Sequence, residues 1–475
     1  MNVMATAGTT APTRSTLSVP TMAMLVVGSM VGAGVFSLPR QFAQSTGAAG
    51  ALVAWGVAGA GTLMLALVFQ MLAVRRPDLD AGVYAYAKAG FGEYLGFFSV
   101  FGYWASACVG NVTYWVLITS TLGAVFPALG SGDTFLAVAV GSAGLWLFFA
   151  IVRRGIQEAT AVNRVVTVAK LVPIVVFVVL AVVAFDPAVF ADNWGGSPGS
   201  GTLLDQVRGT MLVTVFVFLG VEGASTFSRH ARRRQDVGRA TLLGFGSVFA
   251  LFASVTIVSY GILPADEIAQ LEEPSMGGVL DAAFGSWGTT FVSAGLVVSV
   301  LGAYLAWTLM AAEVLFVAAR DGDMPRFLRT TNEHDAPVPA LLMSTALAQA
   351  VLLLTLASER AFDFALELTG ALVLIPYLLA AAYGVRLLRR DRSPRGQLVV
   401  ATLATLYTAW LLFAAGIDHL LVVFVVYAPA SVLFVLTRGE QGRRWFSPRE
   451  RVVLAVSLLG AAAGLVALFT GLIAL

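Results

Sequence analysis

Residues 21–46 read TMAMLVVGSMVGAGVFSLPRQFAQST, and this stretch decides how the rest of the chain is interpreted. It is apolar and long enough to cross a lipid bilayer, which takes about 20 residues of helix. Three glycines nevertheless interrupt its centre, Gly28, Gly32 and Gly34, and Pro39 follows them. A broken helix is tolerated in hydrocarbon only where its free N–H and C=O groups face protein, water or a ligand. The stretch therefore predicts a binding site halfway across a membrane.

The composition places the whole chain in a membrane. Of its 475 residues 58% are hydrophobic and 12% are charged, and the mean hydropathy is +0.85. A soluble domain has about a quarter of its residues charged. The single cysteine, Cys108, excludes an intramolecular disulfide and a Cys-rich metal site. Walker A, HExxH and GxGxxG patterns do not occur, so we expect no enzyme, no cofactor, no bound metal and no nucleic-acid partner.

Thirteen apolar segments recur along the chain at lengths that fit membrane crossings. They are residues 18–44, 48–74, 92–126, 134–152, 159–185, 203–230, 239–263, 288–320, 338–357, 361–388, 396–416, 419–437 and 452–474. Lys and Arg gather in every second connection, as at Arg75 and Arg153, whereas Asp186 and Glu272 mark the others. Because basic residues resist translocation, we expect the N-terminal tail, residues 1–17, in the cytoplasm. Only two of the 29 basic residues are lysines, a bias typical of a GC-rich genome, and we expect a bacterial inner membrane.

A second apolar segment is interrupted in a similar way. Residues 203–230 contain Gly220, Glu222 and Gly223 near their middle, about 190 residues and five segments after the first break. Paired breaks in corresponding positions of two halves are typical of transporters built from inverted repeats. We therefore predict an all-α, polytopic membrane protein with a five-plus-five inverted-repeat fold and twelve or thirteen transmembrane helices. The expected repeats are residues 18–185 and 203–390, and the expected additional helices lie within 396–475.

The first break can bind an anion. After a break, the next half-helix presents free N–H groups and the positive end of its dipole, which favour a substrate carboxylate. The alternative is that Gly28 and Gly32 simply pack against a neighbouring helix as small residues spaced by four. The matching break in the sixth segment favours the binding site.

Two ionisable residues lie deep in apolar segments. Glu222, in the second break, could bind a substrate ammonium, take up a proton or hold the break through hydrogen bonds, or it could be a structurally bonded glutamate. Lys170, about twelve residues into the fifth segment, needs an acceptor or a counter-charge. It could supply a fixed positive charge where a related carrier holds Na⁺, or bond helices locally.

Three further residues are candidates for substrate contact. Asn111 could be a ligand or could bond neighbouring helices. Trp307 lies deep in its segment rather than at an interface, and Phe216 precedes Glu222 by six residues. Aromatic faces attract a guanidinium or ammonium group, more strongly where water is excluded.

The chain resembles the amino acid/polyamine/organocation transporter superfamily, and within it the basic amino acid antiporters of the arginine:ornithine kind. The resemblance covers most of the chain. It is carried by GSMVGAGVFSLP at 28–39, PDLDAGVYAYAKAGFGEYLGF at 77–97, YWASACVGN at 103–111, GIQEATAVNRVVTVAK at 155–170, FLGVEGAS at 218–225 and AWTLMAAEVLFVAARDGDMP at 306–325.

The resemblance implies alternating access and a set of site residues. The substrate carboxylate is expected at Met30 to Gly34, a run that includes Gly32 and Ala33, and the α-ammonium at the backbone carbonyls of Phe216 and Leu219. The remaining expected contacts are a polar ligand at Asn111, a gate at Trp307, a guanidinium contact at Thr369, proton- or substrate-dependent gating at Glu222 and a sodium-replacing charge at Lys170.

The chain also departs from the pattern of arginine antiporters of acid resistance. Those proteins carry a tryptophan where Phe216 stands and a hydroxyl residue where Ala33 stands, and the thirteenth segment lies outside the shared core.

We expect sodium-independent exchange of arginine for ornithine, with the lipid bilayer as surroundings and a homodimer as a compatible state. The alternatives are arginine/agmatine or lysine/cadaverine exchange, a proton-coupled amino acid permease, and, from a different class, a transporter-like membrane sensor. A sensor would need a large soluble domain, and no connection or tail is long enough for one.

Overall fold

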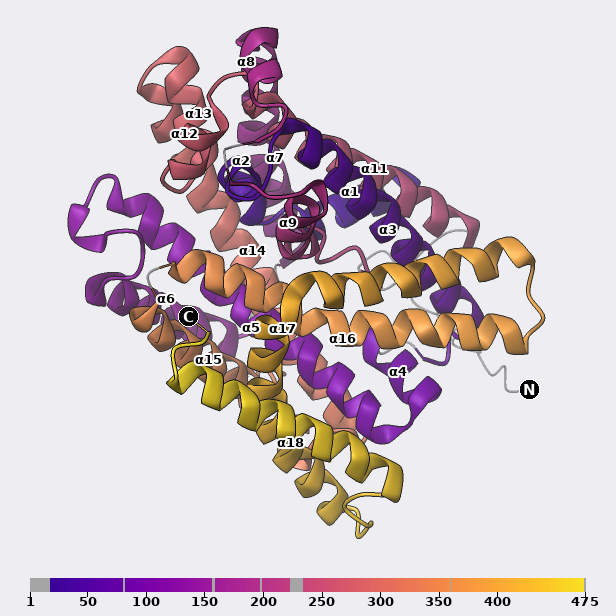
Figure 1. The fold of residues 1–475 in the computed structure, drawn as a ribbon. Coiled ribbons are helices and arrows are strands. Elements are labelled where there is room, and N and C mark those ends of the chain that lie inside the picture. The colour runs from indigo at the N-terminus through magenta and orange to yellow at the C-terminus, as the bar shows by residue number, and fades with distance from the viewer. Residues whose placement is uncertain are drawn as a thin grey trace, which may run out of the picture.

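A computed structural model describes residues 18–79, 82–155, 159–196, 199–222, 234–358 and 360–473. All regular structure within these ranges is helical (Figure 1). The helices are α1 (Val19–Met30), η1 (Gly34–Ser37), α2 (Leu38–Ala43), α3 (Ala48–Arg75), α4 (Val83–Phe91), α5 (Glu93–Gly123), η2 (Pro127–Leu129), α6 (Phe135–Arg153), α7 (Ala159–Val183), α8 (Pro187–Asp192), α9 (Leu203–Val217), α11 (Arg234–Ser259), α12 (Ala265–Gln270), α13 (Ser275–Phe284), α14 (Trp287–Arg320), η4 (Arg326–Arg329), α15 (Val338–Leu354), η5 (Thr355–Ala357), α16 (Ala361–Arg390), α17 (Arg395–Glu440) and α18 (Pro448–Phe469).

Nine helices in the described ranges are long and apolar enough to span a membrane, or ten if the bent pair Val19–Met30 and Gly34–Ala43 is one span. The first apolar segment covers α1, η1 and α2, and the sixth begins with α9 and continues outside the described residues; each of the others coincides with a helix or with half of one. Two segments share the 46-residue α17, which at 1.5 Å per residue would be about twice the thickness of the hydrocarbon core. Gly416 divides it, with φ 80° and ψ 167°, and Figure 1 shows the resulting sharp turn.

Local sequence fixes where several helices begin. Thr202 and Asp205 form a reciprocal capping box at the start of α9, and Ser447 and Glu450 form another at the start of α18. Ser18 caps α1 and precedes Pro20 in its first turn. Such caps satisfy N–H groups that have no partner inside the helix.

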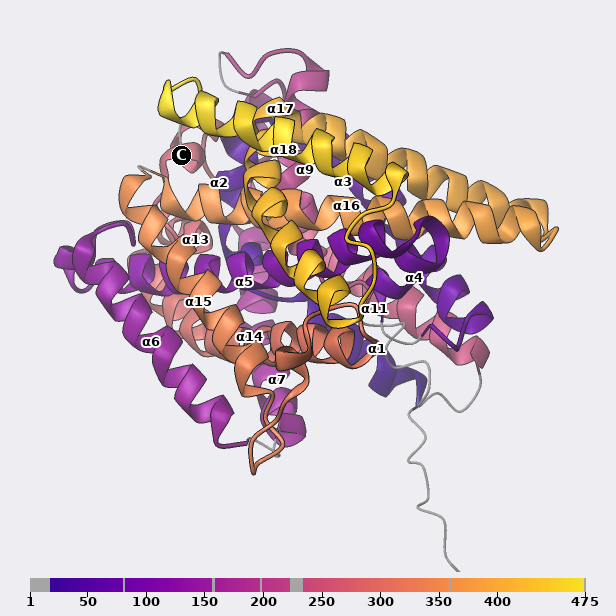
Figure 2. The same ribbon diagram turned by 90° about the horizontal axis from the view of Figure 1, so that it is seen from below.

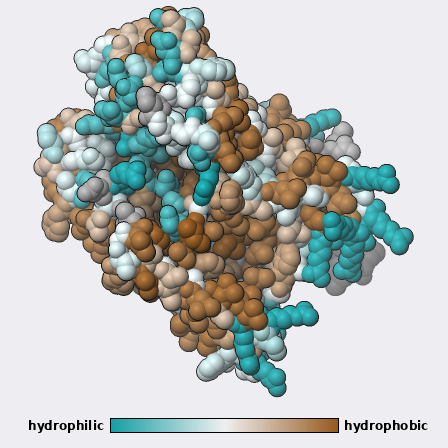
Figure 3. Space-filling view, viewed as in Figure 1, coloured by the Kyte–Doolittle hydropathy of each residue, from teal (hydrophilic) through white to brown (hydrophobic). Residues whose placement is uncertain are grey.

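The core is built around α5 and α16, which pack against each other. In the most apolar 18-residue window of α5, 94% of residues are buried, compared with 22% for α18. The peripheral helices therefore present their apolar sides outward. In Figure 3 a broad hydrophobic band crosses the molecule. Hydrophilic residues gather on the two opposite sides of this band. The view from below shows α18 lying along the outside of the bundle (Figure 2).

Close helix packing predicts a measurable cost for filling a core glycine. A Cβ at Gly102 would overlap the hydroxyl of Tyr427, a fully buried side chain that donates a 2.9 Å hydrogen bond to Leu372 O. Because overpacking costs about 1–3 kcal/mol, we expect Gly102→Ala to lower the melting temperature of the purified protein. Gly56→Ala is the matched control, since its Cβ would meet nothing within 4 Å. Equal melting temperatures for the two variants would contradict this packing.

Candidate functional site

The first predicted break is present. α1 ends at Met30, Val31 is extended, and the next half-helix begins at Gly34, bent by 56° from the first. Among the described residues, the backbone N–H groups of Gly32 and Ala33 donate no hydrogen bond. These groups are therefore free to bind an acceptor in the space beside them.

The second break follows α9. The helix ends at Val217, and Gly220 takes a positive φ of 97°, a conformation that glycine adopts without strain. Glu222 follows directly, whereas Gly223, the third residue predicted at this break, lies outside the described residues.

The two breaks touch each other. Ser29 Oγ, one residue before the end of α1, donates a 3.0 Å hydrogen bond to Gly220 O. A Cβ at Gly220 would lie 2.5 Å from Ser29 O, and one at Gly34 would lie 2.8 Å from the ring of Phe216. Glycine at both positions is what permits this approach.

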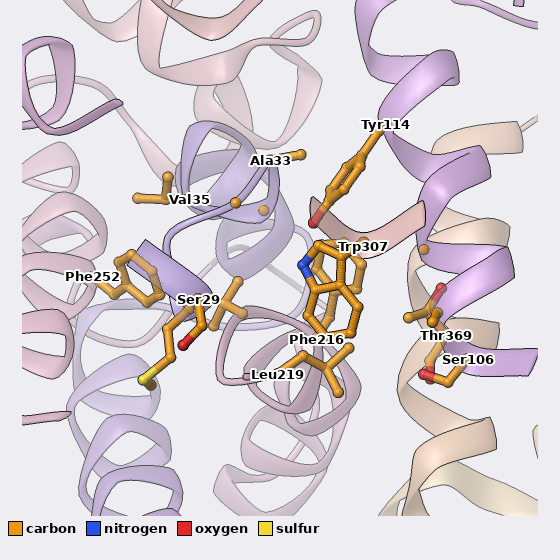
Figure 4. Close-up of a pocket in the computed structure, with 16 residues that line it drawn as sticks. Ser29, Ala33, Val35, Ser106, Tyr114, Phe216, Leu219, Phe252, Trp307 and Thr369 are labelled. Carbon is orange, nitrogen blue, oxygen red and sulfur yellow. The ribbon is translucent and has the colours of Figure 1, made fainter. Parts of the chain in front are cut away.

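A cavity opens between the breaks and α5, α14 and α16 (Figure 4). Its volume is about 400 Å³. Its described lining is uncharged. The residues are Ser29, Met30, Gly32, Ala33, Gly34, Val35, Ser106, Ala107, Gly110, Tyr114, Phe216, Val217, Leu219, Phe252, Trp307 and Thr369.

The structure brings together most of the residues expected to contact substrate. The following line the cavity: Met30, Gly32, Ala33, Gly34, Phe216, Leu219, Trp307 and Thr369. The sequence analysis missed one face of α5, which contributes Ser106, Gly110 and Tyr114. Their spacing of four residues was the available signal, because such residues share a helix face.

Asn111 lies behind this face rather than among the described lining residues. Its Nδ2 donates a 3.1 Å hydrogen bond to Thr308 Oγ1, next to Trp307 in the chain, and its buried Oδ1 has no partner among the described residues. In this structure Asn111 joins α5 to α14.

The part of the cavity around Thr369 offers hydroxyl oxygens and an aromatic ring, and no carboxylate is among the described residues that line it. Thr369 Oγ1 donates to Ala365 O at 2.7 Å, and Ser106 Oγ donates to Thr369 O at 2.9 Å. Both hydroxyl oxygens can still accept hydrogen bonds from a cation. The ring of Trp307 faces the same space in Figure 4.

Lys170 is buried against the first break. Its ammonium donates to Gly28 O at 2.8 Å and to Val31 O at 2.9 Å, the carbonyls that α1 leaves free at its C-terminal end. A positive charge is favoured there by the helix dipole. The fixed cation thus satisfies backbone groups that would otherwise need a bound ion or water.

Glu222 joins three parts of the bundle. Tyr103 of α5 donates to its Oε1 at 2.5 Å, and Tyr377 of α16 donates to its Oε2 at 2.7 Å. The carboxyl is buried, and it lies two residues beyond Gly220. Movement of the second break must therefore move or break these bonds.

A second charged network includes Arg40 and Gln41 of α2. Arg40 is 3.4 Å from Glu273 and 3.5 Å from Asp363, and Gln41 donates to Asp363 at 2.5 Å. Glu273 lies in the loop before α13, where burial raises the pKa of its carboxyl to about 7 although Arg40 opposes the shift. Its ion pair with Arg40 therefore weakens as the pH falls through about 7. No group of three or more His, Cys, Asp or Glu side chains in the described ranges is placed to hold a metal ion.

A broken helix that meets the end of α9 at a cavity whose described lining is uncharged, inside a bundle of membrane-spanning length, is typical of a membrane carrier for a small solute. A sequence model of the family described as amino acid permease matches residues 17–471, and the chain belongs to that family, within the amino acid/polyamine/organocation superfamily. Its members are transporters rather than enzymes, which agrees with the sequence analysis.

Three relatives cover nearly the whole chain. The chain is 44% identical to an arginine/ornithine antiporter of Pseudomonas aeruginosa over 95% of its own length and 97% of the relative's. It is 38% identical to an L-lysine transport protein of Corynebacterium glutamicum, covering 98% and 97% of the two chains. It is 35% identical to an arginine/agmatine antiporter of Chlamydia abortus, covering 90% and 92%.

The contacts of Lys170 predict a strong effect of its removal. Lys170→Met would leave two buried carbonyls without a partner, at about 1–3 kcal/mol each, and we expect transport by reconstituted protein to fall at least about tenfold. Wild-type transport should be equal in sodium and choline media. Lys88→Met, which removes the only other lysine and a partly exposed pair with Asp323, should change the rate less than about twofold. Full activity of Lys170→Met would exclude the proposed role.

Replacing Glu222 tests the junction with the two tyrosines. In Glu222→Gln one carboxylate oxygen becomes an NH₂ group, so one tyrosine hydroxyl loses its acceptor. We expect exchange to be slower by about tenfold or its pH profile to shift, with normal insertion into the membrane. Glu313→Gln, at an exposed position of α14, is the control. Unchanged kinetics over the pH range would remove the gating role of Glu222.

Proposed function

We propose that the protein exchanges arginine for ornithine across a bacterial inner membrane, without sodium, by alternating access. The observation that carries this proposal is the 44% identity, over 95% of the chain, to a protein named arginine/ornithine antiporter. Arginine and ornithine both combine an α-amino acid group with a distal cation. The cavity offers backbone groups of the two breaks for the first, and an aromatic ring with hydroxyl oxygens for the second.

The proposed pose uses the two breaks for the part that both substrates share. The α-carboxylate would accept hydrogen bonds from the free N–H groups of Gly32 and Ala33, and the α-ammonium would donate to the carbonyls of Phe216 and Leu219. The distal cation would lie between the ring of Trp307 and the oxygen atoms near Thr369. One cavity can then hold arginine and the shorter ornithine.

Exchange follows from the cost of moving the empty carrier. Without substrate, the N–H groups of Gly32 and Ala33 have no acceptor in the described protein, so we infer that reorientation of the empty protein is unfavourable. A loaded carrier avoids that cost. This difference supports obligate exchange rather than net flux.

The proposed orientation puts the N-terminus and the Arg-rich connections in the cytoplasm. The two tyrosines that donate hydrogen bonds to Glu222 then lie on the cytoplasmic side of the cavity, and the Arg40 network lies on the outer side. We further propose that residues 18–185 and 203–390 are the inverted repeats and that 396–475 adds helices facing lipid or a second copy in a homodimer.

Two other substrate pairs have support from relatives. The names of the 38% and 35% identical relatives favour lysine transport and arginine/agmatine exchange, respectively. Agmatine lacks a carboxylate, so it would leave the first break without its proposed ligand.

Proteoliposomes test the proposal directly. We expect uptake of labelled arginine to be at least about tenfold faster into vesicles loaded with ornithine than into empty vesicles, because only the loaded carrier returns. Vesicles loaded with agmatine, lysine or cadaverine separate the alternatives. Equal uptake into empty and ornithine-loaded vesicles would rule out obligate exchange, and faster uptake with agmatine inside would favour the second substrate pair.

A further inference from the structure

Tyr114 stands out in the cavity because its hydroxyl has no partner among the described residues. The side chain is 94% buried, as its relative exposure is 6%, yet Oη forms no hydrogen bond within that part of the chain. Buried tyrosine hydroxyls usually have one. Figure 4 shows this hydroxyl pointing from α5 into the space between Ala33 and Trp307.

The hydroxyl lies beside the first break. A Cβ on Gly32 would be 2.9 Å from Tyr114 Oη, so the absence of a side chain at Gly32 makes room for it. Gly32 and Ala33 also have N–H groups that donate no hydrogen bond in the described part of the chain. Three free donors, two from the backbone and one from a side chain, therefore meet at one place.

Other side chains at this break do not provide a free donor. Ala33 has no hydroxyl, and Ser29 Oγ already bonds to Val26 O and Gly220 O. A cluster of donors without an acceptor fits an anionic group, whereas a cation would meet only the lone pairs of Oη. Hydrogen bonds from such donors to a carboxylate are short and strong.

We propose that Tyr114 Oη donates a hydrogen bond to the substrate α-carboxylate and so sets the preference of the carrier for amino acids over the corresponding decarboxylated amines. The inference rests on the proposed function only in placing an α-amino acid at the first break. Tyr114 is then an additional specificity-determining residue. It supplies a hydroxyl group at the first break, where residue 33 is alanine.

Competition against labelled amino acid uptake tests the proposal with Tyr114→Phe. The inhibition constants of arginine and ornithine should rise about tenfold or more, the loss expected for a hydrogen bond to a charged group. The constants of agmatine and putrescine should change less than about twofold, because these amines have no carboxylate for the hydroxyl to bind. The melting temperature should not fall, because the hydroxyl bonds to nothing in the described protein.

Tyr260→Phe is the matched control. Its buried hydroxyl donates to Thr46 O at 2.7 Å, away from the cavity, so the variant should lose stability while keeping the ratio of amino acid to amine constants. For Tyr114→Phe, an unchanged arginine constant would overturn the proposal. Equal weakening of arginine and agmatine would overturn it too, by placing the hydroxyl at the distal cation.

The test separates this inference from the proposed function. Failure of arginine/ornithine exchange appears in the wild-type protein before any variant is made. If the wild-type protein transports lysine instead, the same comparison is made between lysine and cadaverine, and the dependence on a carboxylate still decides the role of Tyr114.

Discussion

The close approach of two unwound backbones is the constraint on which the structure depends. Hydrocarbon supplies no hydrogen bonds, so each break must be satisfied by protein or ligand. Gly34 and Gly220 remove the side chains that would keep the breaks apart, and Ser29 bonds across the gap. The cavity lies beside this contact, with residues of both breaks in its lining.

Charged side chains lie around the cavity rather than among the described residues that line it. Lys170 satisfies the carbonyl end of α1, and Glu222 is held by two tyrosine hydroxyls, whereas the described lining is neutral. A positive charge at the first break favours a carboxylate on the same side. A neutral distal end suits cations of different length, because aromatic rings and hydroxyl oxygens do not fix one position as a carboxylate would.

The sequence predicted the breaks well because glycines clustered in the middle of an apolar span either interrupt the helix or let another backbone approach closely, and here they do both. It predicted the α5 contribution less well. That helix is buried on nearly every side, so it carries no polar face to mark which residues line a cavity, and its buried Asn111 donates a hydrogen bond to Thr308 of α14 instead. The Arg40 network could not be predicted at all, since its partners Glu273 and Asp363 lie more than 200 residues away and follow no local pattern.

Two charged groups that lie near the cavity are close to the breaks along the chain. Arg40 lies six residues after Gly34, about 9 Å along the helix, and Glu222 lies two residues after Gly220. The bent half-helix Gly34–Ala43 cannot tilt at the first break without moving Arg40. In the proposed pose, a carboxylate at the first break would therefore act on the ion pairs of Arg40 through α2, and an ammonium at the second break would lie close to Glu222 along the chain. Coupling between the first break and the Arg40 network would then require only rotation of the half-helix that carries Arg40.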